Sequence, residues 1–329
     1  MSICVRSCII SFVNDEMERS VNILRAGGLV AFATETVYGL GADATNALAV
    51  RKIFAAKGRP STNPLIVHVA DAEIARRYAT AWPVTAVHLA RNFWPGPLTM
   101  VLPKSPAIVD EVTANQNTVG LRVPNHPVAM QLLRKFDGAI AAPSANRANH
   151  ISPTSAADVK AELGDSVDLI LDGGPCAVGI ESTVIDLTGD RPCILRPGGI
   201  SREQLQAVIG PVDIFTGTVN IETEAKSPGQ HIRHYSPATP TFRFNRSRRD
   251  QMLLRGIVLI VGSAGIVSPE VKEMPDDPVQ YARQLYQTLR AIDERHPPAI
   301  FIEMPPDEPQ WFAVRDRLMR ATVELRIED

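Results

Sequence analysis

Residues 29–69 read LVAFATETVYGLGADATNALAVRKIFAAKGRPSTNPLIVHV and set the pattern for most of the chain. Two short apolar runs, Leu29–Ala33 and Leu65–Val69, are typical of buried strands. Between them, Leu48–Ala56 carries apolar residues at helical spacing. This order of strand, helix and strand predicts an α/β fold in which helices cover a sheet.

The same alternation continues to about residue 210. Further strands are expected at Leu98–Leu102, Val119–Val123, Ala139–Ala142, Leu169–Leu171, Thr183–Leu187 and Cys193–Leu195. Helices are expected at Glu16–Arg25, Val84–Phe93, Val128–Phe136, Ala156–Leu163 and Glu203–Ile209. The last two begin with capping boxes, Ser155 with Asp158 and Ser201 with Gln204. Consecutive strands near the end of this region predict a mixed, twisted sheet.

The length of the chain, 329 residues, favours two domains. We expect a first domain over residues 1–211, a linker over 212–240 and a small α/β domain over 241–329. The small domain should contain strands at Gly256–Val261, Ile300–Glu303 and Val323–Ile327, and helices at Val279–Ile292 and Trp311–Ala321. The linker is either a solvated spacer or a segment that contacts a ligand, because it contains His231, Arg233, His234 and Tyr235.

Composition and charge exclude several classes of protein. The chain has 34 Lys+Arg and 36 Asp+Glu, and residues 1–211 are balanced at 19 of each, which argues against a dedicated nucleic-acid binder. No apolar run reaches the ~18 residues of a membrane span. The first residues read as a strand and lack the cleavage site of a signal peptide. The cysteines, Cys4, Cys8, Cys176 and Cys193, lack metal-ligand spacing and predict buried or free thiols in a reducing cytoplasm.

The loop Lys57-Gly58-Arg59-Pro60 places two cations between a helix and a strand. Lys as a point charge and Arg as a planar fork suit an oligophosphate. A solvated basic helix end would give the same pattern, since the helix dipole favours cations there. Gly58 and the two prolines, Pro60 and Pro64, fix the shape of the loop and leave the two interpretations about equal.

Other polar residues lie on or directly after predicted strands, where ligands of open α/β sheets bind. His68 is either a buried histidine of the sheet or a neutral ligand contact. Arg122 lies on an apolar strand, so it serves a structural ion pair or binds an anion such as a carboxylate. Further candidates follow the same rule: Ser144 and Asn146 after one strand, Ser152 before a helix, Ser182 before a strand and Arg196 at a strand end.

Several well-known catalytic motifs are missing from the sequence. Gly39–Ala44 fits G-x-G-x-x-A, but it does not directly follow a strand and has no acidic residue ~20 positions on, which argues against a dinucleotide site. There is no P-loop, no G-x-S-x-G nucleophile motif and no zinc-ligand motif. The candidate residues therefore favour catalysis by positioning and charge stabilisation.

Taken together, the segments resemble the threonylcarbamoyl-AMP synthase family, the YrdC-like proteins. The matching stretches, in the order of the family, are TETVYGLGADA, KGRPSTNPLIVHV, WPGPLT, VGLRVPNHP, APSANRA, SPTSAADV, IESTVIDL and LRPGGIS. They cover most of residues 20–205. The linker SPGQHIRHYSP and the trailing domain resemble the two-domain branch of this family.

This resemblance implies a fold and a reaction. The fold is an open twisted α/β sheet with a concave ligand cavity, followed by a smaller Rossmann-like domain. The reaction condenses L-threonine, bicarbonate (or CO2) and ATP to threonylcarbamoyl-AMP and pyrophosphate, normally with Mg2+. The enzyme is then a nucleotidyltransferase, and its product passes to a threonylcarbamoyl transferase complex that modifies tRNA beside the anticodon.

The resemblance also implies the site residues. The threonine site maps to Thr36, His68, Arg122, Ala142 and Ser182. The ATP site maps to Arg59, Asn63, Thr118, Ser144, Asn146, Ser152, Arg196 and Tyr235. Lys57, Arg59 and Arg196 are the expected catalytic cations. No metal-ligating residue is implied, because Mg2+ would bind through the ATP phosphates, and His234 or Tyr235 would close the linker over the ligand as a lid.

Two departures from the family pattern concern loops. Gln230-His231-Ile232 replaces a more apolar and basic sequence in the linker, and Arg147–His150 lacks an expected glycine. Three other functions are considered: an RNA-binding module of the same fold, with weak RNA or tRNA contact; a carbamoyl-transfer enzyme; and a dinucleotide oxidoreductase. The missing zinc-finger motifs argue against the second and the missing acid against the third.

Overall fold

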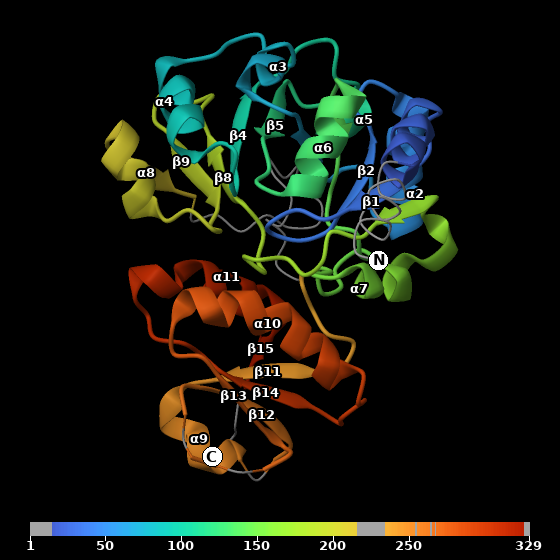
Figure 1. The fold of residues 1–329 in the computed structure, drawn as a ribbon. Coiled ribbons are helices and arrows are strands. Elements are labelled where there is room, and N and C mark those ends of the chain that lie inside the picture. Colours follow the sequence, from blue (N-terminus) through green and yellow to red (C-terminus); the bar gives the residue numbers. More distant parts are fainter. Residues whose placement is uncertain (1–14, 216–233, 254, 264, 267, 326–329) are drawn as a thin grey trace, which may run out of the picture.

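A computed structural model describes residues 15–215, 234–253, 255–263, 265–266 and 268–325 (Figure 1). Over these residues the chain forms a large mixed sheet followed by a small parallel one, as the predicted α/β fold requires. The strand expected before residue 14, with Cys4 and Cys8, lies outside the described residues. So do His231 and Arg233 of the linker.

The large sheet has the strand order β10-β9-β8-β4-β5-β3-β6-β2-β1-β7. Its strands are β1 (Val30–Phe32), β2 (Gly39–Asp43), β3 (Ile66–His68), β4 (Leu98–Pro103), β5 (Thr118–Arg122), β6 (Ile140–Ala141), β7 (Leu169–Leu171), β8 (Thr183–Asp186), β9 (Cys193–Arg196) and β10 (Asp213–Ile214). Parallel pairs such as β3 with β5 alternate with antiparallel pairs such as β4 with β5. The predicted mixed sheet is confirmed, and its edge strand β10 uses residues that we had expected in the linker.

Helices pack on this sheet around one buried apolar core. They comprise a helix over residues 15–25, α2 (Ala47–Lys57), α3 (Ala72–Arg76), α4 (Val84–Phe93), α5 (Asp110–Thr113), α6 (Pro127–Phe136), α7 (Ala156–Leu163) and α8 (Arg202–Ile209). The six expected helices are confirmed within one residue. Both predicted capping boxes form, at Ser155 and at Ser201. Helices α3 and α5 were not expected, because they have one turn or little more and show no helical period in the sequence.

Strand β2 occupies the segment that the sequence suggested as a glycine turn. Gly39 to Gly41 pair with β1, and Ala42 and Asp43 pair with β6. A side chain at Gly41 would meet Phe32 Cε1 and Ile140 Cγ2 at 2.9 Å. Close packing between strands therefore requires this glycine, and the dinucleotide interpretation of the motif is excluded by the strand geometry.

The small sheet is parallel, with the order β13-β12-β14-β11-β15. Its elements are β11 (Thr241–Phe244), α9 (Arg249–Met252), β12 (Ile257–Val261), β13 (Val271–Met274), α10 (Pro278–Asp293), β14 (Ile300–Glu303), α11 (Phe312–Ala321) and β15 (Val323–Glu324). This arrangement confirms the Rossmann-like expectation. Strands β11 and β13 were not expected, because each has four residues and contains charged ones: Arg243 in β11, and Lys272 and Glu273 in β13.

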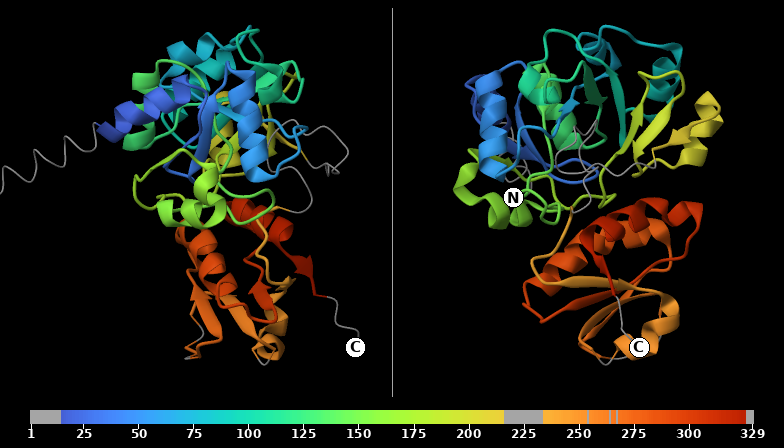
Figure 2. Two further views of the ribbon diagram at one scale, coloured as in Figure 1. Left: turned by 90° about the vertical axis from the view of Figure 1, so that its right-hand side faces the viewer. Right: turned by 180° about the vertical axis from the view of Figure 1, so that it is seen from behind.

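Helices α10 and α11 lie on the side of the small sheet that faces the large one, in each of the views (Figures 1 and 2). Two arginines of these helices cross the contact. Arg317 of α11 reaches Glu181, and Arg290 of α10 reaches Glu162 and Asp158 of α7. None of the described helices is long and apolar enough to span a membrane.

Arg290→Met should lower the free energy of unfolding by about 2–3 kcal/mol, because removing one partner of a largely buried ion pair leaves the other charge uncompensated. Arg290 lies 3.0 Å from Glu162 and also donates to the Ile151 carbonyl at 2.9 Å. Urea unfolding measures the loss. The control is Arg283→Met, an exposed arginine on the same helix, which should stay within ~0.5 kcal/mol of wild type. Equal stabilities of the two variants would contradict the prediction.

Candidate active site

A small cavity opens at the ends of the strands of the large sheet. Its volume is about 40 Å³. Its walls come from the segments after β1 and β6, from β3 and β5, from the β8–β9 region and from His234 and Tyr235. A second, adjoining cavity of about 20 Å³ continues from Arg59 and Ser144 toward Lys57, Asn63 and Asn146. The two cavities together bring most of the predicted site residues into one place.

Arg59 lies in the wall of both cavities. Its Nη2 donates to the Pro64 carbonyl at 3.1 Å, so the loop after α2 folds back on its own arginine. Burial lowers the pKa of Arg59 to about 10; Tyr235 opposes this shift and Arg196 adds to it. The guanidinium therefore remains a cation at neutral pH. An anion in the cavity would relieve its repulsion with Arg196.

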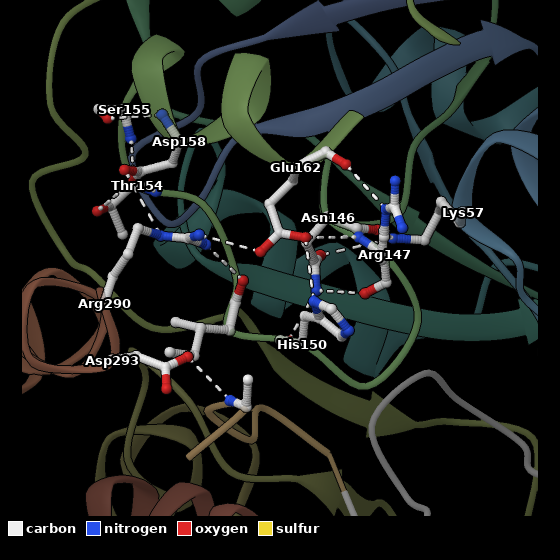
Figure 3. Close-up of polar contacts among 12 residues, drawn as sticks. Lys57, Asn146, Arg147, His150, Thr154, Ser155, Asp158, Glu162, Arg290 and Asp293 are labelled. Atoms are coloured by element: carbon white, nitrogen blue, oxygen red, sulfur yellow. Dashed lines mark hydrogen bonds and ion pairs between the residues drawn. The ribbon is translucent and has the colours of Figure 1, made fainter. Parts of the chain in front are cut away.

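Lys57 holds the loop that carries Ser144 and Asn146. Its Nζ donates to the carbonyl oxygen of Asn146 (Figure 3) and to that of Ser144, each at 2.5 Å. Burial, and then the Arg59 charge, hold the pKa of Lys57 well below its ordinary value. The Asn146 Oδ1 at 3.5 Å is a third acceptor, and three acceptors match the three donors of an ammonium group. Lys57 thus fixes the backbone of a loop that borders the second cavity.

The loop after Asn146 lacks the expected glycine and contains an asparagine with positive φ. Asn149 has φ of 68°, in the left-handed region that favours glycine and that asparagine tolerates. The amide of Asn146 donates to the carbonyls of Arg147 and His150, at 3.0 and 2.8 Å. The loop keeps a tight shape without the glycine, which resolves the departure noted in the sequence.

Arg122 takes part in a buried ion pair. Its Nη2 lies 2.8 Å from Glu35 Oε1 and donates to Thr36 Oγ1 at 3.0 Å. All three residues lie after β1 or on β5, and both charged side chains are less than one-tenth exposed. The sequence left open a structural ion pair or the binding of an anion. The ion pair is present, and the Arg122 guanidinium also lines the cavity, where it could contact an anion.

His68 is buried in β3 and packs edge-on against Phe32, with ring centroids 6.1 Å apart. Burial, and then the Arg122 charge, lower the pKa of His68 to about 3. The imidazole is therefore neutral at physiological pH, as a hydrogen-bonding ligand contact requires. It lines the cavity beside Arg122 and Ala142.

His68 should make the protein less stable in mild acid. A histidine whose pKa is lowered by folding contributes stability above its unfolded pKa, near 6.5, and this contribution is lost as the pH falls below that value. Between pH 7.5 and 5.5 the loss is about 1.4 kcal/mol for one such group. Urea unfolding of His68→Asn should show a correspondingly flatter pH dependence than wild type, while His88→Asn, an exposed control on α4, should not. Parallel curves for His68→Asn and wild type would refute this.

Arg196 and Ser182 form the opposite wall. Arg196 donates to the Ser182 carbonyl from Nε and Nη2, at 3.2 and 3.0 Å, and to Ser182 Oγ at 3.1 Å. Ser182 Oγ also contacts Thr99 Oγ1 at 2.8 Å. Burial lowers the pKa of Arg196, with Tyr235 opposing and Arg317 adding to the shift. A second buried cation thus faces the same cavity as Arg59.

Two predicted ATP contacts lie elsewhere. Ser152 is buried, but its hydroxyl donates to Glu181 Oε1 at 2.6 Å and it does not line either cavity. Thr118 starts β5, two and four residues from Gly120 and Arg122 on the same face of the strand, and also lines neither cavity. The remaining residues of the two predicted sets line one cavity or both: Thr36, Lys57, Arg59, Asn63, His68, Arg122, Ala142, Ser144, Asn146, Ser182, Arg196 and Tyr235.

The linker residues His234 and Tyr235 complete the cavity wall. Tyr235 has a strained φ of 61° and stacks on Tyr286 of α10, with centroids 5.8 Å apart. His234 and Ser236 are held through their backbone amides by Arg320 and Asn149. Arg59 Nε, His234 Nδ1 and Tyr235 Oη are buried without a hydrogen-bond partner in the described part of the chain. Such groups are costly to bury, so a polar ligand would stabilise them.

Two acidic residues of the cavity region were not predicted from the sequence. Glu35 pairs with Arg122, and Glu181 lines the cavity and pairs with Arg317. Both lie inside quoted motifs, TETV and IESTV, and a carboxylate directly beside predicted ligand residues was the available signal. Each acid is neutralised by an arginine, so the cavity as a whole favours anions.

Two family profiles match successive parts of the chain. The profile of Sua5, YciO and YrdC proteins, described as telomere recombination, matches residues 22–198. The profile described as threonylcarbamoyl-AMP synthase, C-terminal domain, matches residues 200–323. Together they cover most of the sequence and both of its sheets.

Individual relatives agree with these profiles. The threonylcarbamoyl-AMP synthase of Bacillus subtilis is 41% identical over 320 residues, which is 93% of this chain and 92% of the relative. That of Pyrococcus abyssi is 39% identical over 92% of this chain and 93% of its own. A crystal structure of P. abyssi Sua5 complexed with L-threonine superposes with a TM-score of 0.87 at 37% identity, over 94% of this chain and 96% of that one. The chain therefore belongs to the two-domain Sua5 family of threonylcarbamoyl-AMP synthases.

Proposed function

We propose that this protein condenses L-threonine, bicarbonate or CO2, and ATP to threonylcarbamoyl-AMP and pyrophosphate. The observation that carries the proposal is the convergence of Arg59 and Arg196 with Arg122 on one cavity whose acidic residues are already paired. Basic groups at this density suit two anionic substrates, a triphosphate and an amino-acid carboxylate. Relatives over the whole length carry the name of this activity.

The ATP half of the site is the pair of adjoining cavities around Arg59. Arg59 and Arg196 would bind phosphate oxygens, and Lys57 would hold Ser144 and Asn146 beside the nucleotide. Asn63 and Tyr235 would complete the contacts. Thr118 and Ser152, which line neither cavity, remain proposed contacts only through the family resemblance. The reaction class is then nucleotidyl transfer, with the two arginines stabilising charge on the α-phosphate as pyrophosphate leaves.

The threonine half of the site lies around Arg122. Its guanidinium would bind the threonine carboxylate while it keeps its contacts with Glu35 and Thr36. His68 is neutral and would act as a hydrogen-bonding partner, and Ala142 leaves space beside it. The relative's structure was determined with L-threonine, which supports this substrate.

The proposed chemistry has two steps. The threonine amine attacks the carbon of bicarbonate or CO2 and forms an N-carboxylate; from bicarbonate, water leaves. A carboxylate oxygen then attacks the α-phosphorus of ATP, the bond to the β-phosphate breaks, and pyrophosphate leaves. Removing one charge-stabilising donor from such a site costs about 2–4 kcal/mol of barrier. Mg2+ would enter with ATP as part of the substrate, because Glu35 and Glu181 are already paired with arginines.

Substrate entry requires movement of the linker residues. Ligand pockets for molecules of this size occupy ~300–1,000 Å³, whereas the cavity bounded by His234 and Tyr235 holds about 40 Å³. We propose that the linker acts as a lid. The proposed domain bounds are 1–211 for the first domain, 212–240 for the linker and 241–329 for the second domain.

The product would pass to a threonylcarbamoyl transferase complex. A weak contact of this protein with tRNA is a further part of the proposal.

The test is product formation by the purified protein. It is incubated with ATP, Mg2+, bicarbonate and labelled L-threonine; pyrophosphate is assayed and threonylcarbamoyl-AMP is sought by mass spectrometry. Both products should appear only when threonine and bicarbonate are present. ATP binding without either product, together with salt-dependent RNA binding, would favour the RNA-module alternative instead.

A further inference from the structure

Glu181 places a carboxylate in the wall of a cavity that otherwise collects cations. It is 6% exposed and lines the cavity together with Arg59 and Arg196. In a phosphate site such a group has two harmful effects. It repels the anionic substrate, and it attracts the nearest arginine into an internal ion pair.

Arg317 forms an ion pair with this carboxylate. It lies on α11, which packs on the small sheet, whereas Glu181 belongs to the large-sheet domain. Its Nε lies 2.6 Å from Glu181 Oε2, its Nη1 binds Asp316 at 2.7 Å and its Nη2 donates to the Pro197 carbonyl at 2.9 Å. Its side chain is fully buried. All three nitrogens therefore have a defined acceptor, and the guanidinium is fixed in place.

Neutral hydroxyl groups donate further hydrogen bonds to the two carboxylate oxygens of Glu181. Ser152 Oγ donates to Oε1 at 2.6 Å, and Tyr286 Oη lies 3.2 and 3.0 Å from the two oxygens. Burial would raise the pKa of Glu181, but Arg317 and Arg196, helped by Ser152, hold it at about 2. Glu181 is therefore ionised at neutral pH, and Arg317 and Arg196 compensate its charge.

We propose that Arg317 is a positioning residue of the phosphate site: by engaging Glu181 it prevents that carboxylate from competing with the triphosphate for Arg196. The C-terminal domain would then act on ATP binding without touching ATP. The guanidinium carbon of Arg317 also lies 5.1 Å from the centre of the Tyr235 ring, so the same residue supports the linker wall. This inference rests on the proposed use of ATP.

Four variants separate this role from a packing role: Arg317→Met, Arg317→Lys, Glu181→Gln and the double variant E181Q/R317M. Affinity for a non-hydrolysable ATP analogue is measured by calorimetry, and kcat and KM for ATP and threonine by pyrophosphate release. R317M should weaken ATP binding by about tenfold or more, with the threonine KM within ~3-fold of wild type, since one uncompensated charge beside a cation is worth at least ~1.4 kcal/mol. R317K should lie between R317M and wild type. E181Q should bind ATP at least as tightly as wild type.

The double variant carries the decisive result. With the carboxylate neutralised, loss of Arg317 should no longer matter, so E181Q/R317M should bind ATP within ~3-fold of wild type. If R317M fails to fold, R317K supplies the weakened single variant, and the double variant should then bind ATP more tightly than R317K. Weak ATP binding by the folded double variant, or unchanged binding by folded R317M, would overturn the proposal.

The matched control is Arg315→Met. Arg315 lies on the same helix but pairs with Asp307, away from Glu181. It should bind the ATP analogue as wild type does. Wild-type protein that binds no ATP would refute the proposed function itself, which is a different outcome from wild-type binding that is insensitive to Arg317.

Discussion

Arg59→Ala should reduce kcat/KM for ATP by about 30-fold to 1,000-fold, equivalent to 2–4 kcal/mol of lost charge stabilisation. The residue lines both cavities, it stays cationic with a pKa of about 10, and its Nε is buried without a partner in the described part of the chain. A phosphate oxygen would compensate the positive charge of Arg59 and accept a hydrogen bond from its unpaired Nε. Steady-state pyrophosphate release and calorimetric ATP binding measure the effect.

Two further variants make this result specific. Arg59→Lys keeps a charge but loses the planar fork, so it should recover only part of the activity. Arg51→Ala removes an arginine of α2 whose side chain is 63% exposed and pairs with Glu111 on the surface. Exposed pairs contribute about 0–1 kcal/mol, so this control should match wild type in activity. A folded Arg59→Ala protein with near-normal kcat/KM would show that Arg59 does not bind the phosphates.

Several of the predicted site residues that line the cavities lie in short, dense motifs. Lys57, Arg59, Ser144 and Asn146 occur in two such motifs, and contacts from Lys57 to the carbonyls of the other loop bring them together. The helices with several turns were also predicted well, because their period is visible over two or more turns. Strand β2 was missed since its small residues, Gly39 to Asp43, have no strand propensity and are selected by close packing.

Contacts between distant segments could not be predicted. Glu181 and Arg317 are 136 residues apart, and Ser152 joins them from a third segment. The hydrogen bond from Ser152, a serine before a helix, to the Glu181 carboxylate was therefore not visible in the sequence. The same reason explains Glu35, whose role is visible only when β5 brings Arg122 beside it. Sequence patterns give local structure, whereas charge compensation is a property of the folded arrangement.

Arg122→Lys should raise the KM for threonine by about tenfold or more and leave ATP affinity within ~3-fold of wild type. Lysine keeps a positive charge beside Glu35, so the buried acid stays compensated, but a single ammonium cannot bind Glu35, Thr36 and a carboxylate in one plane as the guanidinium can. Threonine titration by pyrophosphate release, with ATP saturating, gives the KM. Urea unfolding reports whether the stability is retained.

Arg122→Ala separates the two roles that the sequence left open for this residue. It leaves Glu35 buried and unpaired, so the free energy of unfolding should fall by about 3–5 kcal/mol. Glu35→Gln combined with Arg122→Met removes both charges and should recover most of that stability while the threonine KM stays high. If R122K keeps the wild-type KM and only the alanine variant is impaired, Arg122 is a structural ion-pair partner and the threonine carboxylate binds elsewhere. A selective rise in the threonine KM, in proteins whose stability is restored, requires the guanidinium to contact the substrate.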